Sequence, residues 1–123
     1  MLEFHDVPFN HALRLQLIRR DESGAEVLLP LAAWFSQEND VVHGGIISAV
    51  ADTAAVYAVR GDSPMTGVEF KINFLTPALM TGGPLLATAS IVRRGRTIAV
   101  ASVEVQQDGR AVAQGLFTYL YRT

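Results

Sequence analysis

The segment from residue 39 to 61 constrains the fold most, because it predicts a helix with no polar face. Two glycines follow His43, roughly four helical turns come next, and Arg60, Gly61 and Pro64 then form a typical helix stop. A helix that is apolar on all sides is a buried helix. The apolar residues that cover every side are Ile46, Ile47, Ala49, Val50, Ala51, Ala54, Ala55, Val56, Ala58 and Val59.

One carboxylate, Asp52, interrupts this apolar segment near its middle. An unpaired buried carboxylate costs about several kcal/mol, so Asp52 needs a partner, a proton or a function. A structural explanation, in which a nearby hydroxyl or amide bonds the carboxylate, stays open, although the apolar surroundings favour a functional one.

Composition narrows the class of protein. With 50% hydrophobic and 18% charged residues and a formal net charge of -2, the chain predicts a folded domain without the basic field that nucleic acid or anionic membrane would require. The absence of cysteine excludes disulfides, cysteine metal sites and a cysteine nucleophile. The charged N-terminus and the lack of an apolar run of about 20 residues predict one cytoplasmic domain over residues 1–123.

The rest of the chain shows the two-residue alternation of β-strands. Residues 68–74 are the clearest case, with apolar side chains at every second position, and Asp108-Gly109 is a strong hairpin signal. Extended segments are predicted at residues 12–20, 25–34, 68–74, 85–92, 98–107 and 110–121.

This order, two strands, one helix and four strands, does not suit a parallel array. It predicts an α+β fold in which an antiparallel sheet wraps around the one long helix. Such a sheet exposes its edges, and exposed edges with outward apolar residues usually pair with a second copy of the chain.

The sequence His43-Gly44-Gly45 stands at the start of the helix. The first amides of a helix have no internal partners and carry partial positive charge. Glycines expose these amides, so the segment suits an anion or a developing oxyanion. The alternative is that His43 bonds the preceding loop and that the glycines only permit close packing.

Asp52 lies nine residues beyond His43, which is about 13 Å along a helix axis. That distance is too long for the two side chains to act together within one chain. If both serve one reaction, a second copy must bring its Asp52 to this His43, and a two-fold axis would create two equivalent sites.

Four segments together resemble one known family. Residues 39–58 contain His-Gly-Gly at 43–45 and then Ala-Asp at 51–52, and residues 67–78, 93–97 and 112–115 continue the resemblance. The pattern resembles the hotdog-fold thioesterases, most closely the PaaI-like (phenylacetic acid degradation type) acyl-CoA thioesterases. The resemblance implies hydrolysis of an acyl-CoA, with coenzyme A as part of the substrate and no separate cofactor or metal.

The resemblance also implies roles for the helix start. The Gly44 amide would polarise the thioester carbonyl, with His43 in the same catalytic group and Gly45 beside the substrate. Asp52 of the partner subunit would act as a general base on water, or as a nucleophile that forms an anhydride.

Family members carry an Asn or Gln six residues before the His, to position water or the carbonyl. Gln37 stands at that position, with Asn39 close by as a rival or a substrate contact. A Ser or Thr often assists the carboxylate, and here Ser48, Thr53 and Thr66 all remain candidates.

A basic turn follows the fourth predicted strand. The resemblance implies that it clamps the phosphates of coenzyme A, since guanidinium groups suit phosphate oxygens; the alternative is a solvated hairpin. Phe74 either lines the same channel or is an ordinary strand residue. The turn consists of Arg93, Arg94, Gly95, Arg96 and Thr97.

The main prediction is therefore an acyl-CoA thioesterase that works as a homodimer, assembled further into a tetramer as a dimer of dimers. The alternative is a non-catalytic hotdog module that binds or senses acyl-CoA. A hydratase on the same fold resembles a different arrangement of His and acid, which this sequence lacks.

Overall fold

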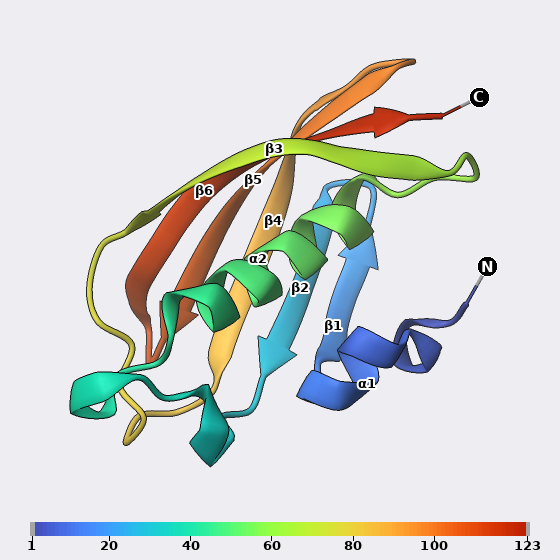
Figure 1. Cartoon of the computed structure of the whole chain (residues 1–123). Coiled ribbons are helices and arrows are strands. Elements are labelled where there is room, and N and C mark those ends of the chain that lie inside the picture. The colour runs from blue at the N-terminus through green and yellow to red at the C-terminus, as the bar shows by residue number, and fades with distance from the viewer. Residues whose placement is uncertain (1, 123) are drawn as a thin grey trace.

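The computed structural model of the protein describes residues 2–122 and shows one sheet curled around one long helix (Figure 1). The sheet is antiparallel, with six strands in the order β1-β2-β4-β5-β6-β3. The long helix is α2 (Gly44–Val59), and no helix among residues 2–122 is long and apolar enough to cross a membrane. The strands are β1 (Gln16–Asp21), β2 (Gly24–Leu29), β3 (Met65–Phe74), β4 (Leu85–Arg94), β5 (Ile98–Gln107) and β6 (Arg110–Tyr121).

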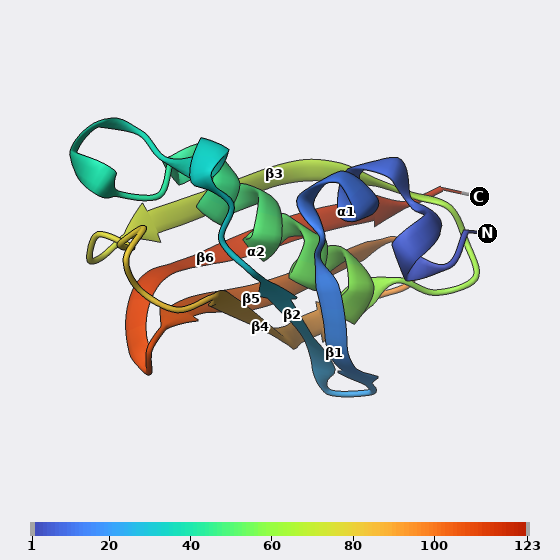
Figure 2. The ribbon, with the colours of Figure 1, turned by 90° about the horizontal axis from the view of Figure 1, so that it is seen from below.

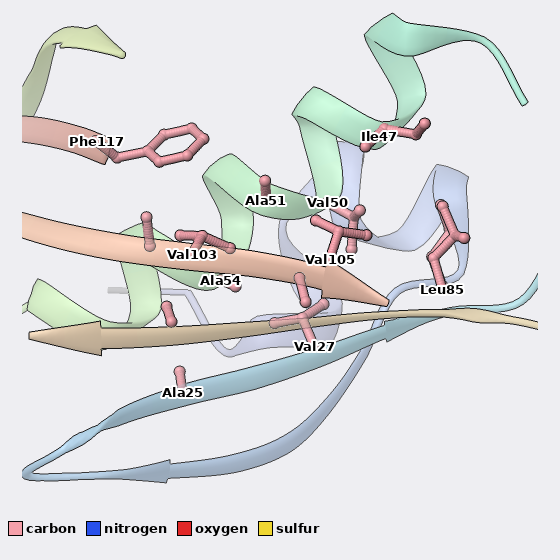
Figure 3. Close-up of a cluster of buried hydrophobic side chains, with 14 of the residues drawn as sticks. Ala25, Val27, Ile47, Val50, Ala51, Ala54, Leu85, Val103, Val105 and Phe117 are labelled. Carbon is pink, nitrogen blue, oxygen red and sulfur yellow. The ribbon is translucent and has the colours of Figure 1, made fainter. Parts of the chain in front are cut away.

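The core lies between α2 and the concave face of the sheet. Every second residue of β5 is buried against the helix, including Val103 and Val105, as the strand period requires. Small residues on α2, among them Ala51 and Ala54, are fully buried and allow the helix to pack closely. Figure 3 shows this cluster, with Val103 and Val105 reaching toward the helix. The predicted α+β fold, with the sheet wrapped around a buried helix, is confirmed.

The N-terminal region differs from the prediction of a strand over residues 12–20. A short helix, α1 (Pro8–Leu13), precedes β1, and the strand begins only at Gln16. Proline at the first helical position favours the helix start, and Arg14, with φ 58°, ends it in the left-handed conformation. A 3₁₀ turn, η1 (Phe4–Asp6), lies before α1, and Figure 2 shows this region near the C-terminal end of α2.

The predicted extended segment 25–34 is also too long. Strand β2 ends at Leu29, next to Pro30, which cannot donate to a sheet. The chain then forms two 3₁₀ turns, η2 (Ala33–Phe35) and η3 (Glu38–Asp40), before α2. The later strands lie where the alternation predicted them, and β5 and β6 have the predicted bounds.

Helix α2 ends where the stop signal predicted, but by another means. Gly61 is not in the left-handed conformation, and side chains from the sheet bond the last carbonyls instead. The Arg20 Nε donates to the Tyr57 carbonyl at 2.8 Å, the Arg94 Nη2 donates to the Ala58 carbonyl at 2.7 Å, and the Tyr121 hydroxyl donates to the Val59 carbonyl. These contacts supply the partners that the end of a helix lacks.

Strand β3 is the edge of the sheet beyond β6, and it carries exposed apolar residues. Val68 is 56% exposed and Phe70 is 50% exposed. A bulge between Gly67 and Glu69 shifts the pairing of β3 with β6. This edge therefore combines an unpaired backbone with apolar side chains, the combination that favours pairing with another strand.

Candidate active site

The start of α2 presents one backbone donor that is free. The His43 Nδ1 accepts a hydrogen bond from the Gly45 amide at 2.8 Å, so His43 caps the helix with its side chain. The Ile46 and Ile47 amides bond the His43 carbonyl at 3.0 and 3.3 Å. Within residues 2–122 the Gly44 amide has no acceptor, and it is therefore available to a ligand.

Gly44 lies in an apolar groove of about 450 Å³ next to the end of β3. A Cβ on Gly44 would lie 3.2 Å from the Phe74 ring, so the glycine lets this ring pack on the helix start. Predicted residues Gln37, Gly44 and Phe74 therefore meet in one place. The lining consists of Gln37, Val41, Val42, Gly44, Ile47, Phe74, Leu75, Thr76, Pro77 and Ala78.

The structure places the two candidate amide side chains, those of Gln37 and Asn39, in different positions. Gln37 lines the groove, and its backbone amide is held by the Val41 carbonyl at 2.9 Å. Asn39 lies outside the lining, in η3, at φ 65°, a conformation that asparagine tolerates better than most residues. Gly45 also lies outside the lining of the Gly44 groove. A Cβ at position 45 would lie 3.0 Å from the His43 Nδ1 and would disturb the helix cap.

Asp52 lies on a second groove of about 450 Å³, at the other end of β3. The Tyr119 hydroxyl donates to the Asp52 Oδ1 at 2.5 Å, whereas the Oδ2 makes no hydrogen bond within the described residues. Asp52 thus has the hydroxyl partner that a structural explanation required, and it keeps one oxygen for a ligand. The lining consists of Asp52, Gly67, Val68, Glu69, Phe70, Thr118 and Tyr119.

Tyr119 is the residue of this site that sequence reasoning missed. It is only 4% exposed, and burial, followed by the hydrogen bond and charge of Asp52, raises its pKa far above the usual value. The phenol therefore stays protonated and remains a donor. The sequence predicted a strand over residues 110–121, but it gave no sign of which helix residue lay opposite Tyr119.

The Ser and Thr residues that were expected to assist Asp52 either bond other groups or lie outside its groove. The Ser48 hydroxyl donates to the Gly44 carbonyl at 2.9 Å, and the Thr53 hydroxyl donates to the Ala49 carbonyl at 2.8 Å. Both are bonds to the preceding helical turn, which are common for Ser and Thr within helices. Thr66 is exposed on β3 and does not line the Asp52 groove.

The two grooves are separate in one chain. Gly44 and Asp52 are eight residues apart, which is about 12 Å along the helix. Among the described residues, none lines both grooves. The Gly44 groove includes Phe74 at the C-terminal end of β3, and the Asp52 groove includes Gly67 near its N-terminal end.

The residues of the basic turn between β4 and β5 have different surroundings. The Gly95 amide donates to the Ile98 carbonyl at 2.8 Å, and the Thr97 carbonyl accepts from the Tyr121 amide at 2.8 Å, which closes the turn. Arg94 bonds the end of α2, as described above. Arg96 faces a hollow of about 250 Å³ beside Arg94 and Gly95, whereas Arg93 is exposed outside its lining.

Arg94 bonds the end of α2, whereas Arg96 lines a hollow, so substitutions of these two arginines should affect stability differently. Arg94→Met should lower the free energy of unfolding by about 1 kcal/mol, because the Ala58 carbonyl loses its charged donor. Arg96→Met, the matched control, should change it by less than about 0.5 kcal/mol, as at most surface positions. Urea unfolding of both variants measures the difference; equal stability of the two would contradict a role for Arg94 at the helix end.

The fold defines a class, because an antiparallel sheet curled around one long helix is the hotdog fold. In this chain the central helix has a free amide at its start and a carboxylate at its middle. The comparisons agree, since the family model described as "Thioesterase superfamily" matches residues 39–114. The chain therefore belongs to the thioesterase superfamily, and the predictions of a PaaI-like relationship and of a thioester hydrolase are confirmed.

Individual relatives support the same assignment. The chain is 32% identical to acyl-coenzyme A thioesterase PaaI of Escherichia coli over 83% of this chain and 74% of that protein. It is 27% identical to medium/long-chain acyl-CoA thioesterase YigI of Salmonella typhimurium over 98% and 88%. A solved structure of the E. coli PaaI protein gives a TM-score of 0.91 over 98% of this chain and 88% of that one, and at 24% identity it supports the hotdog fold.

Proposed function

We propose that the protein hydrolyses an acyl-CoA thioester to a free acid and coenzyme A, in a site completed by a second copy of the chain. The observation that carries this proposal is the free Gly44 amide in an apolar groove, separated from the free oxygen of Asp52 by about 12 Å of helix. The names of the PaaI and YigI relatives support acyl-CoA as the substrate class.

The proposed dimer uses the free edge of β3. Pairing two copies of this strand in antiparallel fashion would place the N-terminal end of one β3 beside the C-terminal end of the other. The Asp52 groove of one chain would then face the Gly44 groove of its partner. The exposed Val68 and Phe70 support such an interface, because pairing would remove their apolar surface from water. A tetramer of two such dimers and a cytoplasmic location complete the proposal.

The proposed reaction uses the Gly44 amide of one chain and the Asp52 carboxylate of the other. The Gly44 amide would bond the thioester carbonyl oxygen and stabilise the negative charge that develops there. Asp52 of the partner subunit would take a proton from water while the water oxygen attacks the carbonyl carbon. Collapse of the tetrahedral intermediate would break the carbon–sulfur bond, and the proton would pass to the coenzyme A thiolate. Direct attack by the carboxylate, followed by hydrolysis of the anhydride, uses the same residues.

The remaining polar residues would bind and orient the substrate. Gln37, which lines the Gly44 groove, suits the orientation of water or of the carbonyl. His43 would keep the Gly44 amide in place through its bond to Gly45. Arg96, which lines the hollow beyond the end of α2, suits a phosphate of coenzyme A better than Arg94, which already bonds a carbonyl.

A panel of acyl-CoAs with a thiol-trapping dye tests the proposed function. The purified protein should release one free thiol per acyl-CoA consumed, from an aromatic, a medium-chain or a long-chain substrate. The control is the same assay without protein. Tight binding of an acyl-CoA without thiol release would contradict hydrolysis and would favour the binding or sensing module instead.

A further inference from the structure

We propose that Tyr119 is a positioning residue for the reaction: its hydroxyl holds the Asp52 Oδ1 and so directs the Oδ2 toward the substrate. The inference rests on the proposed function, which makes Asp52 the catalytic carboxylate. It starts from the 2.5 Å bond between the two side chains, which come from β6 and α2 and are 67 residues apart in the sequence. Tyr119 also lies beyond residues 39–114, the segment that the thioesterase family model matches.

The surroundings of Tyr119 hold its ring in one place. The residue pairs with Gly67 of β3 on one side and with Ala99 of β5 on the other. A Cβ on Gly67 would lie 3.9 Å from the Tyr119 ring, so a small residue stands beside the ring where it passes toward α2. A tyrosine has only two side-chain torsions, and this one is 4% exposed. The phenol oxygen is therefore a fixed point against which the Asp52 carboxylate can be oriented.

The chemistry of the groove favours the same role. Glu69 is the other charged residue in the lining of the Asp52 groove, and within the described residues that lining contains no cation. The Tyr119 phenol is consequently the donor that offsets the Asp52 charge. Because its pKa is raised, the phenol keeps its proton and can donate it in a hydrogen bond to the Asp52 carboxylate. It binds one oxygen and leaves the other to receive a proton or to attack.

A purely structural role for Tyr119 is the main alternative, and the chain contains a matched example of one. Tyr121, two residues along the same strand, donates its hydroxyl to the Val59 carbonyl of the same helix. Tyr121→Phe therefore also removes one phenol bond between β6 and α2, but at a distance from Asp52. The two tyrosines can be compared directly.

The experiment is a double-mutant cycle on the complete protein. Tyr119→Phe, Asp52→Asn and the double variant are assayed for kcat and KM with the best acyl-CoA of the panel, and thermal melts check folding. Tyr119→Phe should lower kcat roughly 10- to 100-fold, the size expected for a hydrogen bond to a charged group, with KM within about twofold. In the Asp52→Asn background the same change should cause no further loss, because the residue acts through Asp52. Tyr119→p-aminophenylalanine, which keeps the ring and a donor, should restore most of the lost kcat.

The controls separate failure of the inference from failure of the proposed function. Any loss caused by Tyr121→Phe should be equal in the wild-type and Asp52→Asn backgrounds. An unchanged kcat in Tyr119→Phe, an equal loss in both backgrounds, or no rescue by the amino analogue would overturn the role of Tyr119 while Asp52 remained catalytic. Full activity of Asp52→Asn itself would overturn the proposed function, and the role of Tyr119 with it.

Discussion

Asp52→Asn is expected to lower kcat by roughly 100- to 10,000-fold, the usual contribution of a positioned acid or base. The amide has almost the same shape, and its oxygen can still accept from the Tyr119 hydroxyl, so folding and assembly should be preserved. What is lost is the ability of the second oxygen to take a proton from water or to attack the carbonyl. Thiol release from an acyl-CoA measures kcat, and size-exclusion chromatography measures assembly.

The control for this prediction removes a carboxylate elsewhere. Asp6 is exposed in η1, outside both grooves, and Asp6→Asn should keep the wild-type rate. If the kcat of Asp52→Asn stayed within about tenfold of the wild-type value, the carboxylate would contribute less than the roughly 100-fold expected at least of a general base. The structural explanation, a carboxylate that only ties α2 to Tyr119, would then be the better one.

Much of the fold could be predicted because its signals are local. The start of α2 follows from the glycines after His43, and its burial follows from the apolar residues on every side. Strands β5 and β6 were predicted with their observed bounds because alternation and the Asp108-Gly109 turn mark them. The N-terminal strand was predicted too early because Leu13, Leu15 and Leu17 alternate, although Leu13 belongs to α1.

The candidate site was less predictable, because it depends on contacts distant in the sequence. The spacing of His43 and Asp52 already separated the two halves of the site. It could not reveal that Tyr119 bonds Asp52, or that Arg94 bonds the end of α2 rather than standing free in its turn. Both contacts join residues at least 36 positions apart, and only the register of the sheet against the helix decides them.

A mixture of two inactive variants is expected to regain activity, which is the sharpest test of the shared site. Gly44→Val would crowd the Phe74 ring, whose nearest atom lies 3.2 Å from a Cβ at this position, and should cover the free amide. Loss of one oxyanion donor typically costs about 100- to 1,000-fold in kcat. When Gly44→Val and Asp52→Asn chains are refolded together, each mixed dimer contains one site with both changes and one intact site. Half of the dimers are mixed, so about a quarter of the wild-type activity should return.

The reverse combination gives the opposite outcome and excludes simple stabilisation by mixing. A chain carrying both Gly44→Val and Asp52→Asn, refolded with an equal amount of wild type, spoils both sites of every mixed dimer. Only wild-type dimers remain active, so activity should fall to about a quarter of that of an all-wild-type sample. If each site lay within one chain, the wild-type chains would keep about half of it. Recovery in the first mixture together with a quarter in the second is therefore expected only if Gly44 and Asp52 of different chains act on one substrate.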